Sequence, residues 1–290
     1  MELDEQYRDI LMELVDCAKA MGPYRDDVVV TGGLVPLLYR YHPDYRRPRQ
    51  KPLLTGDLDL TVPEALPLRE NKRLVDCLEQ GGFVVVRSRS ATGDAPAKQF
   101  FQRQEYGTED LAPIHGEFLS PLTGPETYRD GKPKSPREIQ SGLNAEALRF
   151  LDLLLWNPIT IDLSSIEDLE VSESLVVQLP GPGAYCVQKA LCSDRRGSRE
   201  KRDKDLAYLY DVATLTHDQW SALREEIEGL RRASAVWAKW ITTAAQILDE
   251  AFGSSTGFGS DAVQLVYEGA VQANTVARVM VRFSSGLGLK

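Results

Sequence analysis

The chain has 290 residues, of which 42% are hydrophobic, and its formal net charge is −9. It is long enough to bury one large core or two modest ones, and its acidity argues against general coating of nucleic acid, which needs a broad basic face. No run of about 18 apolar residues occurs, so we expect no membrane span. The acidic residues after Met1 are unlike a secretory signal or a mitochondrial presequence, and we therefore expect a cytoplasmic protein.

Hydrophobic spacing predicts a mixture of helices and strands in the first 180 residues. Helices are expected over 4–20, from the glycine pair Gly32-Gly33 to Tyr39, over 68–80 and over 144–156. Strands are expected over 28–30, 57–62, 83–88, 98–102, 114–119, 160–163 and 174–179. Three prolines make 41–54 a loop.

The motif "LPGPG" at 179–183 marks a change of character, because the chain beyond it has mainly helical periodicity. Helices are expected over 184–193, 202–214, 217–250 with a break, and 261–282. The sequence therefore predicts an α+β fold with a small mixed sheet and a C-terminal helical region. We expect two domains, 1–180 and 181–290.

Asp57 and Asp59 are the first candidates for a functional site. Side chains alternate along a strand, so these two carboxylates face the same way while Leu58 and Leu60 point into the core. Two carboxylates so close repel each other unless a cation lies between them, and hard divalent ions prefer such oxygen ligands. We therefore expect a magnesium or manganese site. An exposed edge strand with its acids outward is the alternative interpretation.

Gly32 and Gly33 end a strand that could pair beside the aspartates. Glycines let a backbone approach phosphate oxygens closely, and a helix that begins there would favour an anion. A third acid on a later strand would complete a two-metal site for in-line phosphoryl displacement. Glu117 is positioned for this role, and Asp162 is the next candidate.

These residues resemble a known family. Gly32-Gly33, the run Thr55-x-Asp57-x-Asp59 and a later strand acid are similar to the nucleotidyltransferase superfamily with a DNA polymerase β-like core. The segment "PGPGAYCVQKALCSDRRGSREKRDKDLAYLYDV" resembles the AbiEii and MenT-like branch, in which a helix lysine and a basic loop precede a Lys-Asp pair. The resemblance covers roughly residues 28–213.

The resemblance implies roles for single residues. Asp57, Asp59 and Glu117 would be metal ligands, and the backbone of Gly32 and Gly33, with Thr55 nearby, would contact the nucleoside triphosphate. Further residues implied in phosphate contact or catalysis are Lys189, Arg195, Arg196 and Asp205. Lys189 could instead extend from a packed helix face, and Asp205 could serve only its helix terminus. Leu53 stands where many members have an arginine, for which Lys51 could substitute.

The implied function is transfer of a nucleoside monophosphate to an acceptor hydroxyl. The branch suggests the 3′ end of tRNA as acceptor and a toxin that is paired with an antitoxin protein. The basic runs 45–51 and 194–205 suit an RNA backbone. Alternatives are transfer to a small molecule such as an aminoglycoside, transfer to a protein side chain, or a nucleotide-binding module without catalysis.

Overall fold

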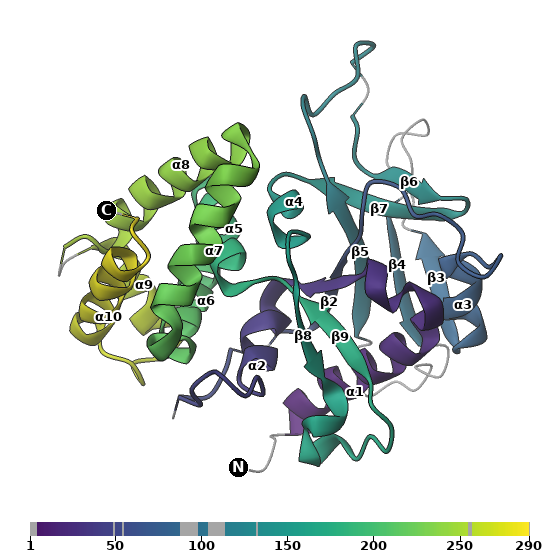
Figure 1. The fold of residues 1–290 in the computed structure, drawn as a ribbon, viewed down its shortest axis with the longest axis horizontal. Helices are drawn as coiled ribbons and strands as arrows, with labels where there is room; N and C mark the ends of the chain where they lie inside the picture. The colour runs from purple at the N-terminus through teal and green to yellow at the C-terminus, as the bar shows by residue number, and fades with distance from the viewer. Residues whose placement is uncertain are drawn as a thin grey trace. The chain divides into compact units, whose positions relative to one another are not determined.

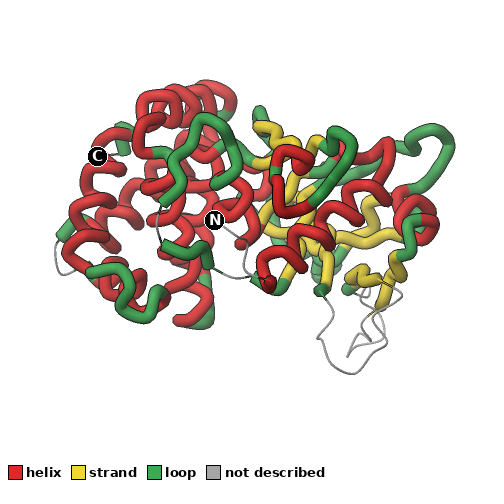
Figure 2. The backbone as a smooth tube through the Cα atoms, turned by 90° about the horizontal axis from the view of Figure 1, so that it is seen from below, coloured by secondary structure: helices red, strands yellow, loops and turns green. Residues whose placement is uncertain are grey.

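A computed structural model describes residues 5–48, 50–53, 55–87, 98–103, 114–131, 133–254 and 257–289. The chain divides into two compact units, one of Met1–Val35 with Leu54–Pro180 and one of Pro36–Leu53 with Gly181–Lys290. All described strands belong to the first unit, and the described part of the second consists of helices and loops (Figure 2). The predicted α+β class is confirmed.

The first unit is built on one mixed sheet, which has nine strands among the described residues. They are β1 Val29–Thr31, β2 Asp57–Thr61, β3 Phe83–Arg87, β4 Gln99–Arg103, β5 His115–Pro121, β6 Arg137–Gln140, β7 Leu143–Leu148, β8 Ile159–Asp162 and β9 Val176–Leu179. The main path runs β3-β4-β5-β2-β1-β9-β8, and β7 joins β5 and carries β6 (Figure 1). β2 is antiparallel to β1 and parallel to β5, so it lies inside the sheet.

Helices α1 (Glu5–Met21) and α3 (Leu74–Gln80) pack against each other beside this sheet (Figure 1). The apolar stripe of α1 is buried, and α1 comes so close to the end of α3 that a Cβ on Gly81 would lie 2.3 Å from the Cβ of Ala20.

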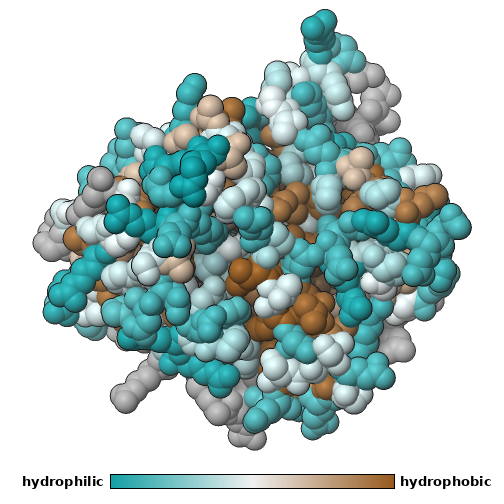
Figure 3. Space-filling model, viewed as in Figure 1, coloured by the Kyte–Doolittle hydropathy of each residue, from teal (hydrophilic) through white to brown (hydrophobic). Residues whose placement is uncertain are grey.

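The surface in Figure 3 is mainly hydrophilic, with apolar residues visible near β8 and β9. The exposed fraction of Val176, in β9, is 42%.

Two predicted helices of this unit are wrong in extent. Residues 143–148 form strand β7, and only Leu151–Leu154 are helical, as α4. Leu143, Ala145 and Ala147 are buried and alternate with more exposed residues, so the period is two and the segment pairs with β5 and β6. The helix predicted over 68–80 begins only at Leu74, because Glu70 and Asn71 have φ values of 52° and 60°.

The second unit contains α5 Pro182–Arg195, α6 Arg199–Leu215, α7 Trp220–Ala233, α8 Ala235–Phe252, α9 Phe258–Val266 and α10 Ala273–Gly286. Short helix α2 (Val35–Tyr39) carries the chain from the first unit into the second. Short 3-10 helices occupy Gly22–Asp27, Gly32–Leu34, Leu163–Ser165, Glu167–Leu169 and His217–Gln219. Among the described residues, no helix has both the length and the apolar character that crossing a bilayer requires.

Residues 36–53 lie with the helical unit, whereas the sequence places them in the domain 1–180. Tyr39 contacts Tyr185 edge-on at 6.2 Å between ring centroids, and Arg46 pairs with Asp218. The backbone N–H of Arg46 also donates to the carbonyl of Leu215 at 2.8 Å. These contacts join residues that lie 146 to 172 positions apart in the sequence, which local sequence patterns do not reveal.

The "LPGPG" motif is explained by Glu226 of α7. Its carboxylate accepts hydrogen bonds from the backbone N–H groups of Gly183 (2.9 Å) and Ala184 (2.8 Å), in the first turn of α5. A Cβ on Gly181 would lie 2.2 Å from Glu226 Oε1, so a side chain at residue 181 would displace this carboxylate. Burial raises the pKa of Glu226, and the two backbone hydrogen bonds oppose that rise.

Candidate functional site

The glycine turn after β1 lies directly against Asp59. Thr31, the last residue of β1, pairs in register with Asp59 of β2. The chain then turns through Gly32, whose φ of +70° is unfavourable for residues with a side chain. A Cβ on Gly32 would lie 1.9 Å from Asp59 Oδ2. Glycine is therefore required at residue 32 by both its backbone conformation and the neighbouring carboxylate.

Asp57 and Asp59 lie on one face of β2, as the alternation predicts. Asp57 is exposed and Asp59 is half-buried, while Leu58 and Leu60 on the other face are fully buried. Asp59 is thus bordered by Gly32 on the β1 side.

Glu117 borders Asp59 on the other side. It pairs in register with Asp59 across the parallel strands β2 and β5, so the two side chains point to the same face of the sheet, with their backbones about 4.8 Å apart. The strand pairing therefore places Asp57, Asp59 and Glu117 on one face of the sheet, on two neighbouring strands. His115 pairs with Asp57 one step further along the same two strands.

The carboxylate of Glu117 is engaged by a lysine. Lys98 Nζ lies 3.2 Å from Glu117 Oε1 and 3.1 Å from Glu146 Oε2. Burial lowers the pKa of Lys98, but hydrogen bonds and charge from Glu146 and Glu117 outweigh this effect and raise it above its usual value. Glu117 is therefore held in an ion pair beside the two aspartates.

The donor chemistry of Asp57 and Asp59 fits a hard divalent cation, since both offer carboxylate oxygens from one face of one strand. The described residues contain no group of three or more His, Cys, Asp or Glu side chains that could hold a metal ion. The aspartate pair would thus share a cation with oxygens of a substrate or of water. Thr55 lies beside the pair, where its Oγ1 is 3.5 Å from the backbone N of Asp57.

Asp162, the second candidate for a third acid, has a different environment. β8 lies at the edge of the sheet, with β1 and β9 between it and β2. The Asp162 carboxylate accepts hydrogen bonds from the hydroxyl groups of Ser164 and Ser174 and from the backbone N–H groups of Ser164 and Leu175, at 2.7 to 3.0 Å. These hydrogen bonds, of which the one from Ser174 has the largest effect, lower the pKa of Asp162 to about 2. Asp162 therefore fixes the loop between β8 and β9.

Lys189, Arg196 and Asp205 meet in the second unit. Lys189 Nζ lies 2.9 Å from Asp205 Oδ1, and Arg196 Nε lies 2.6 Å from Asp205 Oδ2. The side chains of Lys189 and Asp205 are only 6% and 2% exposed, and the Lys189 ammonium lies over the rings of Tyr185 and Tyr208 at 5.5 and 5.1 Å. Asp205 thus joins α5 to α6 through two cations.

The basic run 194–205 is largely neutralised by acids within it. Arg199 and Arg202 both pair with the buried Asp203, and Lys204 pairs with Glu200. Arg195 and Lys201 are exposed. The run 45–51 is also engaged in part, because Arg46 pairs with Asp218 and Arg47 Nε donates to the carbonyl of Arg40 at 3.1 Å.

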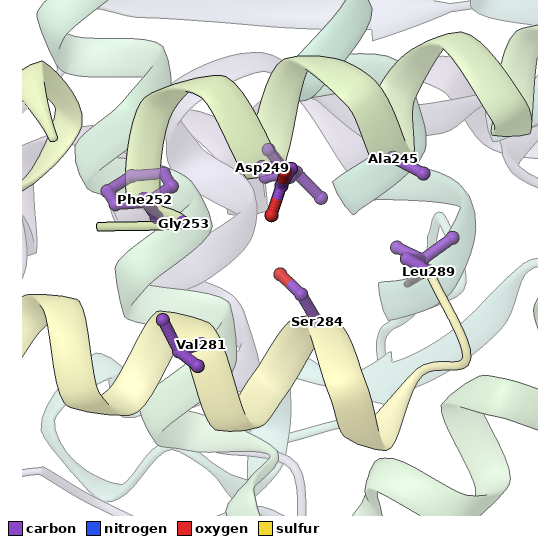
Figure 4. A pocket seen from close by; sticks show the side chains of 8 residues that line it. Ala245, Asp249, Phe252, Gly253, Val281, Ser284 and Leu289 are labelled. Carbon is purple, nitrogen blue, oxygen red and sulfur yellow. The ribbon is translucent and has the colours of Figure 1, made fainter.

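A cavity in the second unit lies between α8 and α10, where Asp249 and Ser284 point toward one another (Figure 4). Its volume of about 10 Å³ leaves room for about one water molecule. It is too small for a nucleotide.

Lys98 and Glu146 are site residues that the sequence did not single out. Lys98 begins the segment predicted as a strand at 98–102, and its side chain reaches β5 only through the pairing of β4 with β5. Glu146 lay in a predicted helix. Its alternation with Ala145 and Ala147 was the available signal.

Comparison with protein families places the chain in a family. A family described as "Nucleotidyltransferase" matches residues 10–229, which is more than half of the chain and includes the aspartate pair, the glycine turn and Asp205. No curated protein matches the chain.

Replacement of Gly32 tests the contact with Asp59. Gly82 also has a positive φ, of +83°, but a Cβ there would have no neighbour within 4 Å. We expect Gly82→Ala to lower the free energy of unfolding by about 1 to 2 kcal/mol through its backbone alone. Gly32→Ala should cost about 1 to 3 kcal/mol more, because the new methyl group displaces the carboxylate. Urea unfolding of both variants measures the difference, and equal losses would contradict the contact.

Proposed function

The chain belongs to the nucleotidyltransferase family, and on this premise we propose that Asp57 and Asp59 form the centre at which a nucleoside monophosphate is transferred from a triphosphate to an acceptor hydroxyl. The observation that carries the proposal is the aspartate pair on one face of β2, bordered by the backbone of Gly32. It combines oxygen ligands for a cation with a bare backbone that phosphate oxygens can approach.

In the proposed reaction, Asp57 and Asp59 hold a divalent cation, magnesium or manganese. When bound, this ion supplies positive charge against the reacting phosphate and the pyrophosphate that leaves. The backbone N–H groups of Gly32 and Gly33, with the Thr55 hydroxyl nearby, orient the triphosphate. The acceptor oxygen bonds to the α-phosphorus as the bond to pyrophosphate breaks, and a carboxylate of this face accepts the hydroxyl proton.

Asparagine substitutions test the centre. We expect Asp57→Asn and Asp59→Asn each to lower transfer from α-labelled nucleoside triphosphates by about a hundred- to a thousandfold, because each removes a charge that positions the reacting groups. Glu79→Gln is the matched control, since Glu79 is an exposed acid of α3 in the same unit. Circular dichroism should show all three variants folded. Unchanged transfer in the Asp57→Asn, Asp59→Asn double variant would contradict the proposal and favour a module that only binds nucleotide.

We further propose that the acceptor is RNA, at the 3′ end of tRNA, and that the protein acts as a toxin paired with an antitoxin protein. The support is the resemblance of residues 180–212 to the AbiEii and MenT-like branch. Arg195 and Lys201 are exposed in the run 194–205, and their replacement leaves intact the pairs that Arg196, Arg199 and Arg202 form with buried aspartates.

Charge reversal at the two exposed positions tests the RNA acceptor without disturbing Asp205. We expect the double variant Arg195→Glu, Lys201→Glu to raise the KM for tRNA by about tenfold or more. The KM of this variant should also depend less on salt concentration, because fewer phosphate contacts release fewer counterions. Arg232→Glu, Lys239→Glu makes the same change of charge at other exposed positions of the second unit and should leave the KM unchanged. Equal effects of both pairs, or label found on protein or on a small molecule, would contradict an RNA acceptor.

A further inference from the structure

Lys98 joins two acids on the face of the sheet that carries the aspartates. Its Nζ lies 3.2 Å from Glu117 on β5 and 3.1 Å from Glu146 on β7. Glu146 pairs in register with Leu119, two residues after Glu117. Residues two apart on a strand share a face, and so do partners in register. Glu146, Glu117 and Asp59 therefore project from the same side of the three strands.

The described part of this face carries several charged side chains. Four carboxylates (Asp57, Asp59, Glu117 and Glu146) lie along β2, β5 and β7, and Lys98 brings one positive charge to the Glu117 end. A lysine ammonium is a compact point charge with three donors. At about 3 Å from Glu117, it lies where a metal ion bound to that carboxylate would experience strong repulsion.

Glu117 is next to Asp59 in the strand register, but its carboxylate forms an ion pair with Lys98. Among the described residues, Glu117 does not form a group of three with Asp57 and Asp59 that could hold a metal ion. The side chains of Lys98, Glu117 and Glu146 are 45%, 26% and 34% exposed, so replacement of the lysine leaves the core intact.

We propose that Lys98 takes the place of a second metal ion: it holds Glu117, and the protein binds a single divalent cation, on Asp57 and Asp59. This inference rests on the proposed function, because it concerns the same centre. It makes Lys98 a positioning residue, which keeps the third acid in place and limits the number of ions bound.

The test is the number of Mn²⁺ ions bound, measured by titration with electron paramagnetic resonance detection of free Mn²⁺. We expect one ion for the unaltered protein and for Lys98→Arg, which keeps the charge. We expect two for Lys98→Met, because Glu117 and Glu146 then lack their cation, and one again for Lys98→Met, Glu117→Gln. Lys72→Met is the matched control, since Lys72 is an exposed lysine of the same unit, and should bind one ion.

Two ions in the unaltered protein, or one ion in Lys98→Met, would overturn the inference. No bound Mn²⁺ in any variant would overturn it together with the proposed cation site. Transfer assays on the same preparations separate the remaining cases. If transfer depends on Asp57 and Asp59 but the number of bound ions differs from the expected one, only the role of Lys98 is contradicted. If the number of bound ions rises from one to two in Lys98→Met but no variant transfers a nucleotide, the role of Lys98 is supported and the proposed function is contradicted.

Discussion

The contact between Gly32 and the Asp59 carboxylate is the constraint on which the candidate site depends. It exists because β1 and β2 pair with Thr31 opposite Asp59 and because residue 32 turns with a positive φ. The hydroxyl groups of Thr31 and Thr61 lie 3.0 Å apart between the same strands and help to fix this register. A slip by one residue would send both aspartates to the buried face, where an unpaired charge is costly.

β2 also determines what lies beyond Asp59. Its other neighbour is β5, and the parallel pairing places Glu117 next to Asp59. β2 therefore has the backbone of Gly32 beside it on the β1 side and the side chain of Glu117 beside it on the β5 side. Lys98 then limits the charge at the Glu117 end. The carboxylates of the site consequently differ in their surroundings: Asp57 is exposed, whereas Glu117 forms an ion pair with Lys98.

The second unit uses charge in a different way. Lys189 and Arg196 converge on the buried Asp205, and Arg199 and Arg202 converge on the buried Asp203. Removal of one member of a buried pair typically costs about 3 to 5 kcal/mol, because the remaining charge has no partner. Loss of activity in a Lys189 variant would therefore report on folding as well as on catalysis.

Local patterns predicted that Asp57 and Asp59 share one face of a strand and that the chain turns at Gly32 and Gly33, because these features depend on strand alternation and on a single turn. The place of Glu117 beside Asp59 depends on the pairing of β2 with β5. They failed where distant strands or units meet. Glu146 was assigned to a helix because leucines follow it in 148–155, and the role of Lys98 depends on the pairing of β4 with β5. Arg46 is held by Asp218, 172 positions away in the sequence, which assigns residues 36–53 to the helical unit. Such pairings follow from tertiary packing and leave no local signal.

The most direct test is a crystal structure of the protein with Mn²⁺ and a non-hydrolysable nucleoside triphosphate, in which anomalous diffraction locates the manganese. The account predicts manganese on the carboxylates of Asp57 and Asp59, with the triphosphate against the backbone of Gly32 and Gly33. Manganese and triphosphate bound elsewhere, with both aspartates uncoordinated, would contradict it.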